Sequence, residues 1–509
     1  MSLTSPGFLI LLAAAAAVYY LAPKKLRWIV LLAAGLAFYC VGGGLAVLYV
    51  LFTALVVYVC GLALGRLNEK RRADGDRRLA ARRWCVAAAC LLNFGLLFFL
   101  KYWNFTAQLL SPLLGGRDLG VSGLLMPLGV SFFMFQSVGY VVDVYRDKVA
   151  PERNPLKLLL FVSFFPQMVQ GPISRFGELA PQLLAERRFD ADHVKYGLQQ
   201  MMWGYMKKLI IADRAAVLVN TVMGDPWSHG GAVQALGVLF YCVQLYCDFS
   251  GGIDIAVGAA RLFGIELAAN FKRPLFSVSL ADFWRRWHIT LGAWMRDYVF
   301  YPISLSKPFA RLGKAARRRF PGKLGKVIPT SLATFIVYLI IGVWHGANFR
   351  YIAFGFWNGA IITLSILLAP AFESWKSRLG VRETGPWRAF RMAHTAVIVF
   401  FGRYITRAPR LLTALWMVKE LFVHPRFQEL GAVGELGLGA GDLLIVAAGV
   451  LILVLVELFE EKRGDIRLWL EKRPPLIQWL AIALPLLAIL CLGILRGSHI
   501  SSDFIYKQF

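Results

Sequence analysis

Charged side chains are scarce in this sequence of 509 residues. Asp, Glu, Lys and Arg together make up 17% of it, whereas hydrophobic residues make up 58%. One soluble core of this size does not need so much apolar surface, so a soluble globular chain is excluded. The composition predicts an all-α polytopic membrane protein, with about 11–13 transmembrane or re-entrant helices around an internal chamber.

Acidic residues are scarcer still, because 30 Asp and Glu stand against 56 Lys and Arg, for a net charge of +26. The basic residues lie in short blocks between apolar runs and form no patch interleaved with aromatics, so we expect no nucleic-acid partner. The positive-inside rule places the blocks at 66–83, 307–326 and 460–473 in the cytoplasm. Counting through the spans then places both termini outside, in the plasma membrane of a bacterium.

Paired cysteines are absent, since none of the seven cysteines has a Cys-x-x-Cys neighbour. We therefore expect reduced packing cysteines, no metal site and no bound cofactor. The N-terminus lacks the basic region and cleavage site of a signal peptide, so its apolar stretch reads as a retained span. No repeat or low-complexity linker divides the chain. We expect one membrane domain over 1–495, with a family core at about 122–360, and a tail over 496–509.

The apolar runs suggest where the chain crosses the membrane. Spans are predicted at about 5–22, 28–43, 45–65 and 85–101, at 474–495, and more weakly near 122–142. Between about 157 and 305 the runs are shorter. Irregular backbone at membrane depth persists only where protein or a water-filled cavity surrounds it, so we expect broken or re-entrant helices there. The interrupting residues are Pro166, Gly171, Pro172, Gly251, Gly252 and Pro274.

His345 is the strongest catalytic candidate, because it lies at the end of the apolar run Val337–Gly346. An ionisable group inside a membrane segment is costly and is a functional candidate by default. The alternative is a packed, hydrogen-bonded histidine. A neutral imidazole can take the proton of a hydroxyl while that oxygen attacks a thioester. No triad-like serine or cysteine adjoins His345, which disfavours an acyl-serine route.

His288 is the second candidate and lies in the stretch Trp284–Trp294, among tryptophans and arginines. The alternative here is an ordinary aromatic belt at the membrane interface. Asp248, Asp254 and Asp282 are candidates to orient a histidine or line the chamber, although pairing with a cation is the simpler role. The expected cations are Arg261, Lys272, Arg273, Arg285 and Arg286.

Several stretches together resemble the membrane-bound O-acyltransferase family, in its bacterial branch that O-acetylates polysaccharides such as alginate and peptidoglycan. They are Met126–Gly139, Phe164–Arg175, Tyr246–Gly258, Asn270–Pro302, Gly342–Gly346 (GVWHG) and Phe356–Gly359 (FWNG). The resemblance implies that His345 is catalytic and that His288 lines the same tunnel. The further tunnel-lining candidates are Trp344, Trp287, Asn348, Asn358, Gln170 and Asp248.

The chain ends in Phe504-Ile505-Tyr506-Lys507-Gln508-Phe509, which is similar to the terminal Phe-x-Tyr-x-x-Phe motif of this branch. The resemblance implies that the hydroxyl of Tyr506 receives the acyl group and passes it to an extracellular transferase. A short aromatic tail is otherwise an interfacial anchor.

The resulting hypothesis is that acetyl-CoA, a coenzyme A thioester, donates from the cytoplasm through His345 to Tyr506. An extracytoplasmic partner of the SGNH type then passes the group to a polysaccharide, which is the indirect acceptor. D-alanyl transfer to teichoic acid, with a carrier-protein donor, and direct transfer to a membrane lipid hydroxyl are the enzymatic alternatives. A non-catalytic transporter predicts a polar path through several spans. The ionisable intramembrane candidates instead gather between about 248 and 345.

Overall fold

The computed structural model describes residues 1–74, 79–117, 119–123, 127, 129–320 and 322–494, and all of its regular elements are helices apart from one isolated β-bridge. The prediction of an all-α fold is therefore confirmed for the described chain. Helices of the N-terminal half are α1 (Pro6–Leu21), α2 (Arg27–Gly43), α3 (Val47–Asp74), α4 (Leu79–Leu110), α5 (Val130–Tyr145), α6 (Pro155–Ser163), α7 (Phe165–Met168), α8 (Phe176–Leu184), α9 (Ala191–Tyr205), α10 (Asp213–Gly224) and α11 (Gly231–Arg261).

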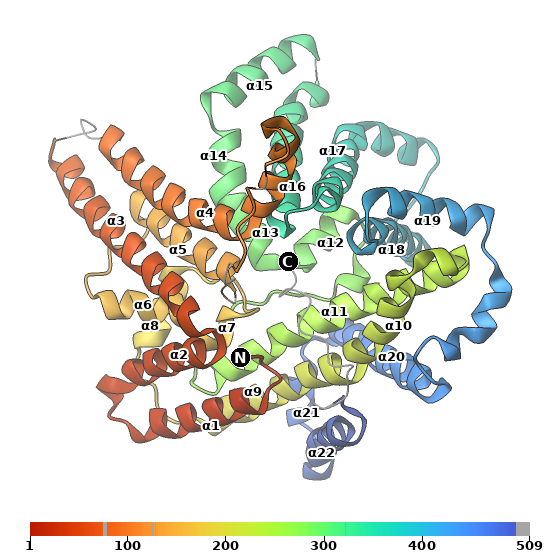
Figure 1. Ribbon diagram of the computed structural model, residues 1–509, viewed down its shortest axis with the longest axis horizontal. Helices are drawn as coiled ribbons and strands as arrows, with labels where there is room; N and C mark the ends of the chain where they lie inside the picture. Colours follow the sequence, from red (N-terminus) through yellow and green to blue (C-terminus); the bar gives the residue numbers. More distant parts are fainter. Residues whose placement is uncertain (75–78, 118, 124–126, 128, 321, 495–509) are drawn as a thin grey trace.

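In Figure 1 the C-terminal half lies mostly at the top and on the right, where α10 and α11 also reach. Its helices are α12 (Leu280–Arg286), α13 (Ile289–Met295), α14 (Tyr301–Ser304), α15 (Lys307–Arg319), α16 (Lys323–His345), α17 (Phe349–Arg378), α18 (Gly385–Arg407), α19 (Leu411–Val423), α20 (Ala440–Arg463), α21 (Ile466–Glu471) and α22 (Pro475–Leu492).

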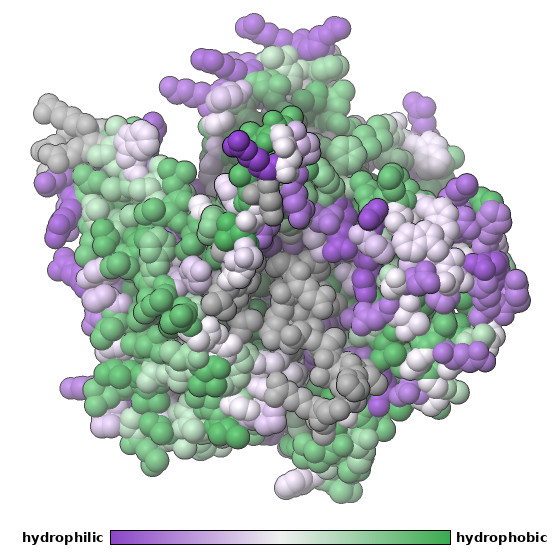
Figure 2. All heavy atoms as spheres, in the orientation of Figure 1, coloured by the Kyte–Doolittle hydropathy of each residue, from purple (hydrophilic) through white to green (hydrophobic). Residues whose placement is uncertain are grey.

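Seven helical segments of the described chain are long and apolar enough to cross a membrane. They are Lys24–Arg72, Leu79–Leu114, Gly231–Arg261, Lys323–His345, Phe349–Arg378, Ala440–Arg463 and Pro475–Leu492. Helices α1 and α5 are apolar but shorter. Figure 2 shows hydrophobic residues spread over the face formed by α1–α4, and Leu55 and Leu91 on that part of the chain are exposed. A large exposed apolar surface is what contact with lipid requires.

Helix α11 runs through the middle of the molecule, close against α9 (Figure 1). A Cβ on Gly204 would lie 2.5 Å from the carbonyl oxygen of Gly251, and one on Gly258 would lie 2.5 Å from that of Gly197. Small residues let two helix backbones approach this closely. The expectation that Gly251 and Gly252 interrupt a helix is therefore wrong, because α11 is continuous there and the glycine at 251 serves packing.

Other predicted interruptions do fall at breaks. Pro166 lies in the first turn of α7, Gly171 and Pro172 lie in the coil before α8, and Pro274 starts a short 3₁₀ turn. A further break appears where none was expected, since the chain widens into a π-helical turn over Met206–Ala212. Such turns are rare and shift the register of the side chains that follow.

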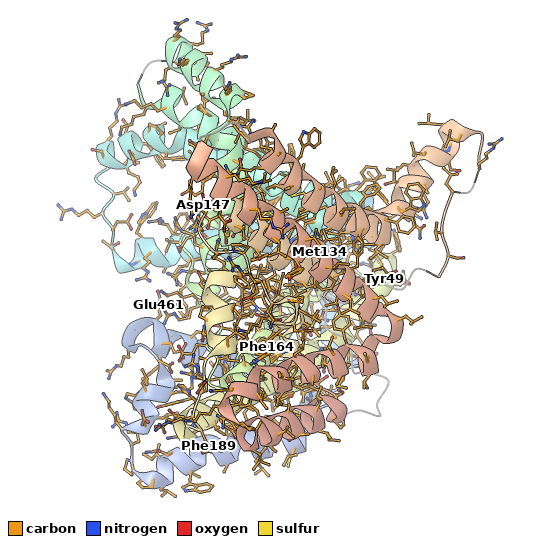
Figure 3. The ribbon with its side chains drawn as sticks, turned by 90° about the vertical axis from the view of Figure 1, so that its left-hand side faces the viewer. Tyr49, Met134, Asp147, Phe164, Phe189 and Glu461 are labelled. Carbon is orange, nitrogen blue, oxygen red and sulfur yellow. The ribbon has the colours of Figure 1, made fainter. Side chains whose placement is uncertain are left out.

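Two of the basic loops lie on the same side of the molecule. Asp147 pairs with Arg71 and Arg72 of the first basic block. Glu461, in the block at 460–473, accepts from Arg273 at 2.9 Å. Figure 3 shows Asp147 and Glu461 toward one side of the molecule and Tyr49 toward the other. The positive-inside rule expects its loops to share one side in this way.

Candidate active site

His345 is the last residue of α16, and the chain turns there so that α17 can pack back against α16. A Cβ on Gly342 would lie 2.5 Å from the carbonyl oxygen of Tyr351 and 3.0 Å from the Cα of Gly355. A Cβ on Gly346 would lie 2.6 Å from the Tyr351 ring. The glycines of the GVWHG stretch are therefore required by the tight crossing that presents His345.

Two side chains of α4 cap the last turn of α16. Lys101 Nζ donates to the carbonyl oxygen of Trp344 at 2.7 Å, and the Tyr102 hydroxyl donates to that of Val343 at 2.9 Å. A cation at a helix C-terminus stabilises carbonyls that have no partner within the helix. This lysine was not predicted from the sequence, although a lone charge at the end of an apolar run was a signal for it.

His288 occupies the turn between α12 and α13 with a left-handed backbone (φ 49°). Asn270 Oδ1 accepts from the backbone N–H of Thr290 at 3.0 Å and from its hydroxyl at 2.8 Å, and it lies 3.2 Å from His288 Nδ1. Because this oxygen is an acceptor, Nδ1 carries the proton and Nε2 carries the lone pair. Asn270 lies in the motif stretch Asn270–Pro302, but no role was predicted for it from the sequence.

The antiparallel bridge between Phe271 and Trp287 brings Asn270 and His288 together. The backbone N–H of Ile289 donates to the carbonyl oxygen of Asn270 at 3.0 Å, and that of Lys272 donates to the carbonyl oxygen of Arg286 at 2.9 Å. Residues far apart in sequence are thus fixed by backbone hydrogen bonds. The turn that carries His288 is held in place from both sides.

Trp344 lies near both histidines. Its ring centroid is 4.9 Å from that of His345 and 6.0 Å from that of His288. Phe132 of α5 adds a further aromatic ring, 6.1 Å from His288 and 6.2 Å from Trp344. The structure therefore brings together three of the predicted site residues, although they come from separate segments of the chain.

The two histidines line different cavities. His345 lines a small one of about 20 Å³, together with Arg403. His288 lines a larger one of about 580 Å³. Trp284 and Trp287 line both cavities. The two indoles therefore form a wall between them, and displacement of that wall would join the spaces.

Polar groups hold this wall in place. Trp284 Nε1 donates to Asn358 Oδ1 at 3.0 Å, and Asn358 Nδ2 donates to the carbonyl oxygen of Phe354 at 2.8 Å. The guanidinium of Arg403 lies 5.5 Å from the ring centroids of both Trp287 and Phe354. Arg403 is buried and lines the His345 cavity. It was not predicted from the sequence, although an arginine directly after the apolar run of α18 was a signal.

Of the six predicted tunnel residues, Trp287 lines these two cavities, and the other five lie outside their linings, including Trp344 and Asn358. The side chain of Asn348 caps α17 by accepting from the backbone N–H of Arg350 at 3.0 Å. Gln170 is fully buried just after α7. Asp248 is also fully buried and forms an ion pair. Tyr506, the tail at 496–509 and Met126 lie outside the described residues.

The acidic candidates have ion-pair partners, but two of these differ from the expected cations. Asp248 pairs with Lys208 at 2.6 Å and Asp254 with Lys207 at 2.5 Å. The π-helical turn brings both lysines against α11, which the sequence pattern did not reveal. Only Asp282 pairs as expected, with Arg286 at 3.3 Å and Arg285 at 3.7 Å. The described part of the chain holds no cluster of three or more metal-ligating side chains.

Known proteins resemble this chain over most of its length. The probable alginate O-acetylase AlgI of Pseudomonas aeruginosa is 32% identical over 441 residues, which cover 84% of this chain and 76% of the relative. The peptidoglycan O-acetyltransferase of Helicobacter pylori is 28% identical over 66% of this chain and 65% of the relative. The teichoic acid D-alanyltransferase of Bacillus subtilis is 28% identical over 55% of this chain and 68% of the relative.

A sequence model of the membrane-bound O-acyltransferase family matches residues 151–317. This range contains Asn270, His288 and the two tryptophans of the wall. The resemblance inferred from the motifs is confirmed by the family match and by the long alignments to the alginate O-acetylases. The chain therefore belongs to the membrane-bound O-acyltransferase family and is an O-acyltransferase.

Proposed function

We propose that the chain moves an acetyl group from cytoplasmic acetyl-CoA, through the site at His345, to an acceptor on the outer side of a bacterial plasma membrane. The observation that carries the proposal is the pair of histidines on the two sides of the Trp284–Trp287 wall. The relatives' names favour acetyl transfer to a cell-surface polysaccharide, because the alginate O-acetylases align with 84% of this chain and the D-alanyltransferase of B. subtilis with 55%.

The larger cavity is suited to an acyl-CoA donor. Its lining includes Arg285 and Arg296 and no carboxylate, and its walls are otherwise largely apolar. Arginine is well matched to phosphate groups, and apolar walls favour the pantetheine arm and the thioester. His288 and the two tryptophans of the wall are among the residues that line this cavity. We therefore assign the donor to this cavity and the reacting carbonyl to the wall that separates it from His345.

The chemical step follows from a neutral histidine beside the acceptor hydroxyl. His345 takes the hydroxyl proton while the acceptor oxygen bonds to the thioester carbonyl carbon. The carbon–sulfur bond then breaks, and the coenzyme A thiolate takes the proton from the histidine as it leaves. Arg403, which faces the same small cavity, stabilises the negative charge that develops on the carbonyl oxygen.

Tyr506 is the acceptor we propose for this step, with both termini on the outer side. An extracytoplasmic transferase of the SGNH type then takes the acetyl group from the tyrosine to the polysaccharide. Coenzyme A is hydrophilic and never crosses the membrane in this scheme. D-alanyl transfer from a carrier protein is the alternative donor chemistry.

Labelled acetyl-CoA tests this route in the purified full chain. We expect label on the peptide that contains Tyr506 in the wild type and none on the Tyr506→Phe variant, because phenylalanine lacks the oxygen that would be acylated. Tyr301→Phe, which alters an exposed tyrosine, should keep the label. Label that persists on Tyr506→Phe would exclude the tyrosine relay. In a parallel assay the donor is labelled D-alanyl carrier protein. Labelling of the protein by that donor but not by acetyl-CoA would select the alternative donor.

The aromatic wall predicts which donors are used. The cavity at His345 measures about 20 Å³, so a short acyl group fits beside the histidine and a long one does not. Trp284→Ala should raise the kcat/KM ratio of hexanoyl-CoA to acetyl-CoA by at least about tenfold, since each methylene accommodated is worth about 1–3 kcal/mol. The control is Trp227→Ala, which alters an exposed tryptophan. An unchanged ratio in a folded Trp284→Ala protein contradicts the role of the wall.

A further inference from the structure

Helix α15 bears six exposed cations, and four of them share one side. Lys307, Arg311, Lys314 and Arg318 recur every three or four residues and are all exposed. At 3.6 residues per turn these four occupy about 60° of the helix circumference, whereas Arg317 and Arg319 lie outside that sector. No Asp or Glu occurs between Lys307 and Lys326. We call the four residues that share one side the α15 cationic face.

The opposite side of α15 packs on α16. Gly313 and Ala316 are buried. A Cβ on Gly313 would lie 3.5 Å from Pro329 of α16, and one on Gly325 of α16 would lie 2.8 Å from the carbonyl oxygen of Ala316. This contact fixes the direction in which the cationic face points, away from α16. Hydrophilic side chains project at the top of Figure 2, where Figure 1 places α15.

Topology alone does not explain the arrangement. The positive-inside rule depends on how many Lys and Arg residues a loop holds, and a disordered loop with the same number would satisfy it. The four residues of the α15 cationic face instead lie on one side of an ordered helix, so they form a continuous cationic surface. A cationic surface on a helix that itself contains no carboxylate favours an anionic partner.

Exposed apolar residues bracket the cationic face. Leu305 is 80% exposed just before α15, and Phe320 is 43% exposed just after it. Tyr301 on α14 and Leu324 at the start of α16 are also exposed. Cations flanked by exposed aromatic and aliphatic side chains are typical of helices at a membrane interface. An acidic soluble protein would not require this apolar rim.

We propose that the α15 cationic face binds the headgroups of anionic phospholipids in the leaflet where α16 enters the membrane. The packing against the Gly325–Pro329 turns of α16 holds the face at the start of that span. The lipid phosphates pair with Lys307, Arg311, Lys314 and Arg318, while Leu305 and Phe320 contact the acyl boundary. This site is separate from both histidine cavities and does not depend on the acyl-transfer proposal.

Lipid retention by the purified full chain tests the assignment. The protein is exchanged into micelles that contain equal phosphatidylglycerol and phosphatidylcholine, and the lipids that remain bound are counted by native mass spectrometry. The wild type should retain phosphatidylglycerol selectively. Affinity for it should fall by about fivefold for each cation removed, since a surface cation contributes about 1 kcal/mol toward an anionic membrane. The combined variant is K307Q/R311Q/K314Q/R318Q.

A matched control removes four exposed cations from other loops, as K24Q/K25Q/R378Q/R382Q, and should keep the selectivity. R311K/R318K, which preserves the charge, should also keep it and guards against misfolding of the fourfold variant. Equal phosphatidylglycerol retention by the wild type and the fourfold variant overturns the proposal. Capture of an acidic protein by the α15 cationic face, with lipid retention unchanged, overturns it in favour of a protein partner.

Discussion

Replacing His345 with alanine should lower kcat for acyl transfer by about 10²–10⁴-fold, the range expected when a general base is removed. His345 is the residue that ends α16 at the small cavity, and Trp284, Trp287 and Arg403 surround it there. The donor cavity shares the two tryptophans, but its lining includes His288 in place of His345. The substitution should therefore lower kcat, while the affinity of the protein for coenzyme A stays close to that of the wild type.

The measurement is acetyl transfer by purified protein in lipid nanodiscs, alongside direct binding of coenzyme A. His424→Ala is the matched control, because the side chain of this exposed histidine pairs with Glu420, away from both cavities. It should retain full activity. Wild-type turnover in His345→Ala would remove this histidine from the chemistry. Loss of coenzyme A binding in the same variant would instead place it in the donor site.

The two histidines predicted at the site are polar groups whose free-energy cost in an apolar or aromatic segment is visible in the sequence alone. An imidazole at the end of an apolar run and a histidine within a dense aromatic motif are unusual wherever they occur. The all-α fold was predictable for a similar reason, since long apolar runs have few alternatives to helices in a membrane. His345 and His288 follow from these local patterns, Trp344 follows from the family resemblance, and the structure places the three together.

The missed residues act through contacts that the sequence does not display. Asn270 contacts His288 only because a β-bridge joins two separate segments. Lys101 caps a helix that begins more than two hundred residues later. Arg403 reaches the His345 cavity from α18. Each is a polar group in an apolar neighbourhood, so its presence could have been noticed, but its partner could not.

Lys208→Met should be among the most destabilising single changes in this chain. Lys208 is fully buried and pairs with Asp213 at 2.8 Å and with Asp248 at 2.6 Å. Both carboxylates are also fully buried. Removing one partner of a buried ion pair leaves uncompensated charge and costs about 3–5 kcal/mol in the free energy of unfolding. The measurement is the thermal or denaturant unfolding of the full chain in detergent, with Lys419→Met as the exposed control.

A triple variant separates the free-energy cost of breaking the cluster from the stability that the intact cluster provides. The lysine and the two carboxylates join the π-helical turn and α10 to the central helix α11. If the loss arises from two stranded carboxylates, then Lys208→Met combined with Asp213→Asn and Asp248→Asn should recover much of the stability, because no charge is left buried. If the triple variant stays as unstable as Lys208→Met, the cluster itself holds the helices together through its hydrogen bonds. If Lys208→Met is as stable as the Lys419 control, neither explanation holds, and the glycine contacts of α9 with α11 suffice to fix this part of the fold.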